Sequence, residues 1–397
     1  MSKKGTIGIL TGGGDVPGLN PAIRAVTYRA LREGYRVLGI RRGWAGLVDC
    51  VPEKGADNSD CVRELTEDIV NRAGRTGGTF LHTSRTRPSH LPLSNVPPHL
   101  ADRYRDEIND VTPEVLRNLE FLGIDTLIPI GGDDTLSYGA RLHEEGLKVV
   151  AIPKTMDNDV PGTDYCIGFS TCVTRTIELT HALRTTAGSH ERFLVIEVFG
   201  RYAGFTAILP TMAGAADRCV IPESPFEIER LAELLSRDRS QHPSRYAVVL
   251  ASEGATIHGG VMSFEGEESD QFGHKKLGGI GDKIASNLKA LSPKFNGGRR
   301  VNVVSQRLGY LVRCGDPDAL DSIVPMVFGN LALDTVLSGG SGVLISLRNG
   351  CYDRVPISVI TETKKIVDVS RFYRPDRLRP SYQDLLGKPL FVMTAES

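Results

Sequence analysis

The sequence predicts an α/β protein built from doubly wound, mostly parallel sheets. Apolar runs of strand length alternate with segments of helical periodicity, the order expected when each helix returns the chain to a parallel neighbouring strand. A second observation is that several turns after expected strands are rich in glycine or carboxylates, and open α/β sheets bind ligands at that edge. The clearest expected strands are residues 6–10, 127–130, 149–152, 193–198 and 246–251. The clearest expected helices are residues 21–33, 113–122, 136–145 and 170–186.

The composition is that of an ordinary globular protein. Of the 397 residues, 40% are apolar and 24% are charged, and the formal net charge is -1. This balance argues against a nucleic-acid binder and a polybasic membrane protein, since both usually carry a basic excess. We find no signal peptide and no apolar run of membrane-spanning length, and expect a cytoplasmic protein. The seven cysteines form no CxxC pair and are expected to be buried, reduced thiols.

We expect two domains and a C-terminal extension. Residues 1–155, with a crossover from the C-terminus, form the first domain, residues 156–345 form the second, and residues 346–397 pack back on the body. Residues 84–110 and 264–282 interrupt the alternation with Pro, Ser, Gly, His and charged side chains. We expect both segments to be surface insertions or flexible loops.

The first expected strand ends in the turn TGGGD (11–15), which leads into a helix. Glycines let backbone N–H groups approach an anion closely, and a helix N-terminus favours negative charge. The turn therefore suits a phosphate, although a tight strand-to-helix turn without a ligand has the same composition. It matches neither the GxGxxG fingerprint nor the GK[ST] of a P-loop.

A second turn, GGDDT (131–135), adds two carboxylates to two glycines. Carboxylates beside an anion-binding turn repel the anion unless a cation lies between them, and Mg²⁺ held by one or two carboxylates and substrate phosphates is the natural bridge. The alternative for Asp133 is the N-cap of the next helix. Asp134 is also close to that helix start.

A third turn, PKTMDND (153–159), follows an apolar strand. Lys154 is suited to neutralise phosphate, Asp157 to act as a general base, and Asp159 to orient a group or bind metal. Phosphoryl transfer needs these kinds of group because its catalysis is mostly positioning and charge neutralisation. The alternative is a charged, solvated loop, which becomes less plausible when three such turns follow successive strands.

Seven segments together resemble the phosphofructokinase family in their order and spacing. The resemblance runs from residue 6 to about 345 and implies two domains with the active site in the cleft between them, and phosphoryl transfer to O1 of fructose 6-phosphate. The segments are GGGDVPGLNPAIR (12–24), GGTFLHTSR (77–85), GGDDT (131–135), PKTMDND (153–159), ERFLVIEVFGRYAG (191–204), SEG (252–254) and LGYLVRCG (308–315).

On the donor side, the resemblance implies that Gly13 lies against the phosphoryl donor, that Arg85 stabilises the transferred group and that Asp133 holds Mg²⁺. Members that use ATP commonly read GGDG and PGTID, whereas members that use pyrophosphate read GGDD and PKTxD. This chain has the second pair, Asp134 and Lys154. A carboxylate about 4 Å from the α-phosphate of ATP would repel it by roughly 4 kcal/mol at an effective dielectric constant near 20.

On the acceptor side, the resemblance implies that Asp157 takes the proton of the sugar 1-hydroxyl. A neighbouring subunit would contribute Arg192 to the sugar 6-phosphate, so a homodimer or homotetramer with shared sites is expected. A second cross-subunit arginine of the family is replaced by Val304, with Arg300 or Arg307 as possible substitutes. The other residues expected around the sugar phosphate are Thr155, Asp159, Phe199, Gly200, Arg201, Glu253, Tyr310 and Arg313.

The predicted function is therefore Mg²⁺-dependent, reversible transfer of a phosphoryl group from pyrophosphate to fructose 6-phosphate, without nucleic-acid or membrane partners. The alternative donor is ATP. A catalytically silent sugar-phosphate-binding regulator is less consistent with the sequence, because Asp133 and Asp157 are both present. A Rossmann oxidoreductase lacks its GxGxxG fingerprint.

Overall fold

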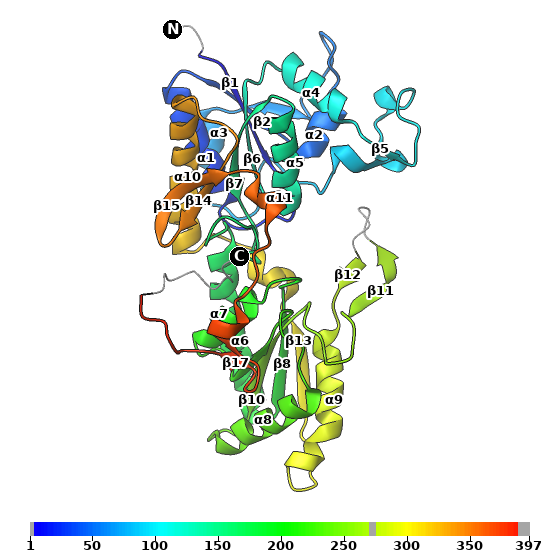
Figure 1. Ribbon diagram of the computed structural model, residues 1–397, viewed down its shortest axis with the longest axis vertical. Coiled ribbons are helices and arrows are strands. Elements are labelled where there is room, and N and C mark those ends of the chain that lie inside the picture. The colour runs from blue at the N-terminus through cyan, green and yellow to red at the C-terminus, as the bar shows by residue number, and fades with distance from the viewer. Residues whose placement is uncertain (1–3, 270–274, 388–397) are drawn as a thin grey trace. The chain divides into compact units, whose positions relative to one another are not determined.

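The computed structural model describes residues 4–269 and 275–387, which form two compact units (Figure 1). Unit 1 comprises the described residues of Met1–Thr155, Val160–Gly168 and Cys314–Lys364. Unit 2 comprises those of Met156–Asp159, Phe169–Arg313 and Lys365–Ser397. Each unit has its own parallel sheet, and we describe each by itself.

Unit 1 is built on a seven-stranded sheet whose inner strands are parallel and whose edge strands, β15 and β3, are antiparallel. The inner strands β1, β6 and β7 are almost wholly buried, as expected for strands covered on both faces. In spatial order the strands are β15 (Cys351–Pro356), β14 (Val343–Arg348), β7 (Lys148–Pro153), β6 (Thr126–Gly131), β1 (Thr6–Thr11), β2 (Arg36–Ile40) and β3 (Val62–Glu64).

Helices cover both faces of this sheet (Figure 1). One face carries α1 (Leu19–Arg32), α3 (Glu67–Ala73) and α10 (Ala319–Leu337), and the other carries α2 (Trp44–Asp49), α4 (Thr112–Phe121) and α5 (Asp133–Glu144). Short α11 (Val359–Glu362) packs on α5.

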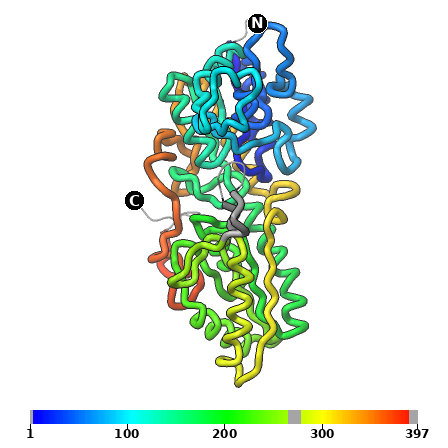
Figure 2. The backbone as a smooth tube through the Cα atoms, turned by 90° about the vertical axis from the view of Figure 1, so that its right-hand side faces the viewer, coloured from blue at the N-terminus to red at the C-terminus, as the bar shows by residue number. Residues whose placement is uncertain are grey.

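Unit 2 has a four-stranded parallel sheet in the order β13 (Val303–Arg307), β8 (Phe193–Val198), β10 (Ala247–Ser252) and β9 (Arg218–Val220). Its longer helices are α6 (Phe169–Ser189), α7 (Phe205–Met212), α8 (Ile228–Gln241) and α9 (Ile280–Phe295). Figure 2 shows α9 running beside β13, against which it packs. The short elements are η4 (Gly309–Arg313), α12 (Val369–Phe372), β16 (Tyr373–Arg374) and β17 (Arg379–Pro380).

The register of the unit 1 sheet places the three predicted phosphate turns at one edge. Thr11 of β1 lies opposite Ile130 of β6, and Gly131 of β6 lies opposite Pro153 of β7. Because these parallel strands end level with one another, the turns that follow them begin side by side. The predicted α/β architecture with parallel sheets is confirmed.

Several details differ from the sequence-based expectations. Residues 314–345, expected in the second domain, lie in unit 1, because α10 packs on α1 and β14 pairs with β7. Helix α5 begins at Asp133, three residues earlier than expected, and Gly132 occupies its N-cap position, so the N-cap alternative for Asp133 is wrong. Cys314 and Cys351 are exposed, unlike the five other cysteines, because both lie on surface segments.

The two interrupting segments contain short ordered elements. Part of 264–282 forms the antiparallel pair β11 (Phe264–Ser269) and β12 (Lys275–Leu277), with residues 270–274 outside the described part of the chain. In 84–110, Arg103 pairs with the buried Glu114, which ties the segment to α4. Its elements are η1 (Pro88–His90), β4 (Leu91–Pro92), η2 (Leu93–Asn95), η3 (Pro98–Leu100) and β5 (Ile108–Asn109). Both segments therefore contain ordered elements, which is compatible with the expected surface insertions.

Helix α10 is long and apolar enough to cross a membrane by length and composition, contrary to the expectation that no such run exists. Within unit 1 its Gly329 lies against Ala25 of α1. Its buried Asp321 accepts hydrogen bonds from the hydroxyl of Tyr165 and the N–H of Gly168. These contacts are those of a core helix.

Candidate active site

The first two predicted phosphate turns of unit 1, residues 11–15 and 131–135, both pack against the side chain of Thr135. A Cβ at Gly12 would lie 2.4 Å from Oγ1 of Thr135, and a Cβ at Gly131 would lie 2.4 Å from its Cβ. Both distances are too short for real atoms, so glycine is required at both positions. The buried threonine thus sets the spacing of the two turns, a role that the sequence analysis did not assign.

Lys154 lies across the glycine turn, as its predicted phosphate role requires. Its Nζ donates to the carbonyl oxygen of Gly14 at 2.6 Å and lies 3.3 Å from the place of a Cβ on Gly13. Gly13 has a φ of 78°, in the left-handed region that favours glycine. The turn therefore presents a cationic amine beside a bare backbone, which suits an anionic ligand.

The segment that precedes Arg85 is joined to the same turn. The N–H of Gly13 donates to the carbonyl oxygen of Ser84 at 2.8 Å, and the hydroxyl of Thr83 donates to the carbonyl oxygen of Gly13 at 2.6 Å. Arg85 itself is exposed. These bonds hold the two residues before Arg85 against Gly13, so the backbone of Arg85 lies close to the glycine turn.

Asp133 and Asp134 occupy the first turn of α5, where the helix dipole favours negative charge. Oδ1 of Asp133 accepts the N–H of Asp134 at 2.9 Å. The surrounding protein and the neighbouring carboxylate of Asp134 raise the pKa of Asp133, while Arg87 and Lys154 act in the opposite direction. The turn is therefore crowded with negative charge that nearby cations partly offset.

Arg87 forms an ion pair with Asp134 that the sequence analysis missed. Its Nη2 lies 2.5 Å from Oδ1 of Asp134. The carboxylate expected to repel ATP is therefore partly neutralised by a side chain of the same unit. The only signal in the sequence for this ion pair is that a second arginine follows Arg85 by two residues.

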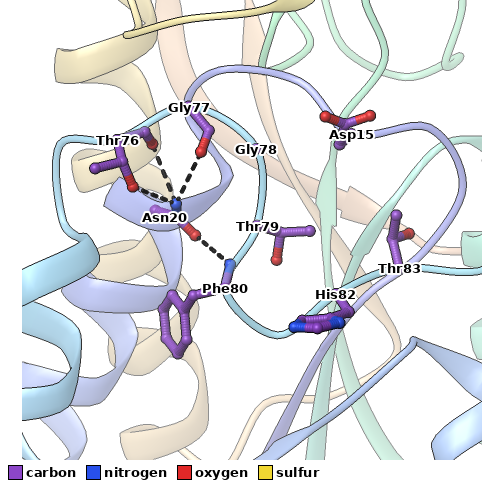
Figure 3. Close-up of a pocket in the computed structure, with 9 residues that line it drawn as sticks. All are labelled: Asp15, Asn20, Thr76, Gly77, Gly78, Thr79, Phe80, His82 and Thr83. Carbon is purple, nitrogen blue, oxygen red and sulfur yellow. Dashed lines mark hydrogen bonds between the residues drawn. The ribbon is translucent and has the colours of Figure 1, made fainter.

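Unit 1 also has a cavity of about 420 Å³ beside the glycine turn (Figure 3). Asn20, in the first turn of α1, holds one wall: its amide donates to the carbonyl oxygens of Thr76 and Gly77, and its Oδ1 accepts the N–H of Phe80. A Cβ at Gly77 would lie 2.0 Å from the carbonyl oxygen of Gly315. Two of the seven motifs, GGTFLHTSR and LGYLVRCG, thus meet in the backbone.

In unit 2 the predicted base belongs to a cluster of charged side chains. Burial raises the pKa of Asp157 well above its ordinary value, and the carboxylates of Asp159 and Glu253 raise it further. Arg201 opposes this through its charge and through its backbone N–H, which donates to Asp157. A partly buried carboxylate whose pKa is raised binds a proton more strongly than an ordinary aspartate, which suits a general base.

The backbone holds this cluster in place. The N–H of Glu253 donates to the carbonyl oxygen of Val198 at 2.9 Å, and the N–H of Gly254 donates to that of Gly200 at 3.1 Å. A Cβ at Gly254 would lie 1.9 Å from the carbonyl oxygen of Arg201. The SEG segment and the Phe199–Arg201 segment therefore pack backbone against backbone, which fixes Glu253 beside Asp157.

Phe199, Tyr310 and Arg313 form a stack at the edge of the same unit. The rings of Phe199 and Tyr310 meet edge to face with centroids 6.3 Å apart, and the guanidinium of Arg313 lies 4.5 Å from the centroid of Tyr310. Tyr310 is 66% exposed. An open aromatic ring and a guanidinium offer a surface for a sugar and its phosphate.

Arg192 is separated from the other predicted acceptor residues. It precedes β8, whereas Phe199 follows it, a separation of about 23 Å at roughly 3.3 Å per residue. Its buried Nε has no hydrogen-bond partner among the described residues. Arg307, a suggested substitute for the arginine lost at Val304, pairs with Glu197 at 2.8 Å.

Asp133 is compatible with Mg²⁺, although no group of three or more potential metal ligands occurs in the part of the chain that the structure describes. Mg²⁺ in phosphoryl transfer needs only one or two carboxylates because substrate phosphates and water complete its octahedron. Asp133 is accessible at this turn, and its carboxylate oxygens are ligands of the kind that Mg²⁺ prefers.

Comparison with known proteins identifies the family. The phosphofructokinase family profile matches residues 6–336. An ATP-dependent 6-phosphofructokinase 3 of Streptomyces coelicolor is 36% identical, covering 92% of this chain and 97% of its own. A pyrophosphate–fructose 6-phosphate 1-phosphotransferase of Amycolatopsis methanolica is also 36% identical, with the same coverage.

The fold is shared with solved phosphofructokinases. A crystal structure of a pyrophosphate-dependent phosphofructokinase from Marinobacter aquaeolei aligns with a TM-score of 0.72 at 18% identity, covering 99% of this chain and 92% of that one. The chain therefore belongs to the phosphofructokinase family, as the sequence predicted. Relatives named for either donor occur at similar identity, so membership leaves the phosphoryl donor open.

Proposed function

We propose that the protein transfers a phosphoryl group from pyrophosphate to O1 of fructose 6-phosphate, giving fructose 1,6-bisphosphate and phosphate. The observation that carries this proposal is Lys154 lying across the glycine turn, with Asp134 at the adjoining turn of α5. Pyrophosphate lacks the contacts that a nucleoside supplies, so a buried lysine on the phosphate turn compensates for them. Since the chemistry is reversible, the same residues would serve both directions of glycolytic flux.

On the donor side, Lys154 and Arg85 neutralise charge on the phosphates, and the N–H groups of the glycine turns orient them. Asp133 would hold Mg²⁺, which supplies charge neutralisation on the transferring phosphoryl group. The oxygen that bridged the two phosphorus atoms leaves with the departing phosphate.

On the acceptor side, Asp157 takes the proton from the 1-hydroxyl as O1 forms its bond to phosphorus. Asp157 follows Lys154, the proposed phosphate-binding lysine, by three residues. Their Cα atoms are therefore at most about 11 Å apart, which limits the distance between the base and the donor phosphates. Thr155 and Asp159 flank the base. Glu253 and Phe199 would contact the sugar, Gly200 lets the backbone approach it closely, and Arg201 would lie near the reacting groups.

The 6-phosphate would be bound by Tyr310 and Arg313 of one subunit and Arg192 of another. The separation of Arg192 from Phe199 along β8, and the unpartnered Nε among the described residues, support a shared site. We therefore propose a homodimer or homotetramer. Sedimentation that shows a fully active monomer would contradict this.

ATP is the second candidate donor, because relatives named as ATP-dependent are as similar as those named for pyrophosphate. The test is formation of fructose 1,6-bisphosphate by the purified protein with each donor at equal concentration and with Mg²⁺ in excess. We expect turnover with pyrophosphate and little with ATP. Preference for ATP overturns the donor assignment while leaving the family intact.

A further inference from the structure

Arg87 connects two parts of the candidate donor site. It follows Arg85 by two residues, and its guanidinium lies on Asp134 in the first turn of α5. The segment that carries Arg85 and the turn that carries Asp133 are thus linked by one ion pair. Both partners are partly exposed, with 40% of the Arg87 side chain and 58% of the Asp134 side chain accessible.

The ion pair changes the charge that a donor meets at this turn. Asp133 and Asp134 are adjacent carboxylates in the first turn of α5, and Nη2 of Arg87 lies 2.5 Å from Oδ1 of Asp134. Arg87 therefore offsets negative charge that opposes an anionic ligand. At the same time, its guanidinium is engaged by a carboxylate of the protein, so it is less available to a phosphate.

We infer that Arg87 is a specificity-determining residue for the phosphoryl donor and that it limits donor length through its ion pair with Asp134. This inference rests on the proposed function in one respect, that the donor phosphates occupy the turn before α5. A donor with a third phosphate must compete with the Asp134 carboxylate for the guanidinium. Without that carboxylate, the same guanidinium would bind the third phosphate.

A purely structural role for this ion pair makes a different prediction. Exposed Arg–Asp pairs contribute little to stability, so such a pair should have no influence on which polyphosphate binds. A charge-assisted contact to a phosphate, in contrast, is among the stronger polar interactions of proteins. The two roles are therefore separated by binding selectivity.

The experiment compares inorganic tripolyphosphate with pyrophosphate by titration calorimetry in Mg²⁺ buffer. Neither ligand has a nucleoside, so an adenine pocket does not affect the result. The proteins are the parent, Asp134→Gly, Arg87→Met and the double variant. We expect Asp134→Gly to improve tripolyphosphate binding relative to pyrophosphate by about tenfold or more, and the double variant to lose this gain. Arg87→Met alone should change the ratio much less.

Arg141→Met is the matched control, because Arg141 on the same helix pairs with Asp110 and both side chains are similarly exposed, at 38% and 44%. It should leave the ratio unchanged. Melting temperatures verify that each variant is folded. The inference is overturned if folded Asp134→Gly shows no gain, or if the gain persists in the double variant.

Binding is measured without turnover, so the two proposals fail separately. A parent that does not use pyrophosphate in the fructose 6-phosphate assay overturns the proposed donor, while coupling between positions 87 and 134 is still measured. Independent effects of the two substitutions overturn the role of Arg87, even when the donor assignment holds.

Discussion

The two units treat charge differently. In the glycine turns of unit 1, Lys154 donates to the carbonyl oxygen of Gly14 and Asp134 pairs with Arg87, and these two cations oppose the rise that burial and Asp134 cause in the pKa of Asp133. In unit 2, three carboxylates gather around one site, and burial with like charge raises the pKa of Asp157 well above its ordinary value. A binding site needs compensated charges that hold their positions, whereas a base needs a proton affinity tuned toward the working pH.

The largest expected effect comes from chelation, which should affect the two units unequally. Excess chelator should abolish turnover, because the metal proposed at Asp133 neutralises the donor phosphates, and added Mg²⁺ should restore it. Fructose 6-phosphate binding, measured by calorimetry, should survive, since no metal is proposed for unit 2. Full turnover in excess chelator would rule out the metal role, and loss of sugar binding would contradict the division between the units.

The next largest effect concerns the base. Asp157→Asn should lower kcat by about 10²–10⁴, the usual contribution of general-base catalysis, with little change in the KM for sugar phosphate. Its melting temperature at neutral pH should rise, because the amide removes a partly buried charge that its neighbours disfavour.

Asp217→Asn is the matched control in unit 2. Burial raises the pKa of Asp217 as well, and its carboxylate accepts the N–H of Val248. It precedes β9, at the amino edge of the sheet, so its replacement should leave kcat unchanged. Near-native kcat in Asp157→Asn would remove Asp157 from the role of base.

Donor discrimination should give a smaller effect, within unit 1. Lys154→Met should reduce kcat/KM for pyrophosphate by about 10- to 100-fold, the scale of a lost charge-assisted contact, without admitting ATP. Asp134→Gly should gain ATP-dependent turnover. Because Arg87 already offsets the carboxylate, this gain should stay well below the roughly thousandfold that the uncompensated repulsion of about 4 kcal/mol implies.

The decisive comparison is a set of kinetic measurements with both donors for the parent and the two variants. If Asp134→Gly still excludes ATP, charge repulsion is not the barrier. If Lys154→Met keeps the parent's pyrophosphate kinetics, Lys154 does not neutralise the donor phosphates, although it lies on the glycine turn.

The sequence predicted the fold and the grouping of several site residues well, because those features rest on periodicity and on turn chemistry. Buried parallel strands give continuous apolar runs, and turns after them fall at one edge. The alignment of Thr11 with Ile130 and of Gly131 with Pro153 follows from that rule. Strand 246–251 was placed one residue early, since β10 begins at Ala247.

The sequence could not predict features that depend on contacts between distant residues. Nothing local to Thr135 shows that two glycines close on it, and nothing local to Arg87 shows that it reaches Asp134, 47 residues later. The placement of residues 314–345 in unit 1 likewise follows from α10 packing on α1. These contacts decide charge and spacing at the site, and the repulsion expected of Asp134 was reasoned without the Arg87 ion pair.

Gly131 and Gly132 are adjacent, but only Gly131 packs too closely on Thr135 to accept a side chain. Alanine at each position therefore tests whether this close packing is required. Gly131→Ala should destabilise the protein by about 1–3 kcal/mol, the usual cost of overpacking, because its Cβ would lie 2.4 Å from Thr135. Gly132→Ala should keep the parent's melting temperature, since its φ of -80° suits alanine and its Cβ would meet only the carbonyl oxygen of Lys154 at 3.6 Å. Equal melting temperatures in the two variants would show that Thr135 can move aside.

The smallest effect tests the crowding of charge in unit 2. A base works only as a carboxylate, so the rate falls as the pH falls through its pKa. Asp159 raises the pKa of Asp157, and Asp159→Asn removes that negative charge. The pKa of Asp157 should therefore decrease, and the acid limb of the kcat/KM profile should move to lower pH. Fructose 6-phosphate and pyrophosphate also titrate, but their contribution is the same for parent and variant and cancels in the difference.

Glu253→Gln extends this argument, because Glu253 also raises the pKa of Asp157 and should move the limb in the same direction. It differs from Asp159→Asn in that its side chain is proposed to contact the sugar, so its KM for fructose 6-phosphate should rise as well. Asp102→Asn, at a fully exposed carboxylate of unit 1, should move neither the limb nor KM. An acid limb that stays fixed in both unit 2 variants would mean that the group titrating in the profile is not Asp157. The carboxylates around Asp157 would then have no measurable effect on catalysis, and the difference in charge between the two units would not bear on function.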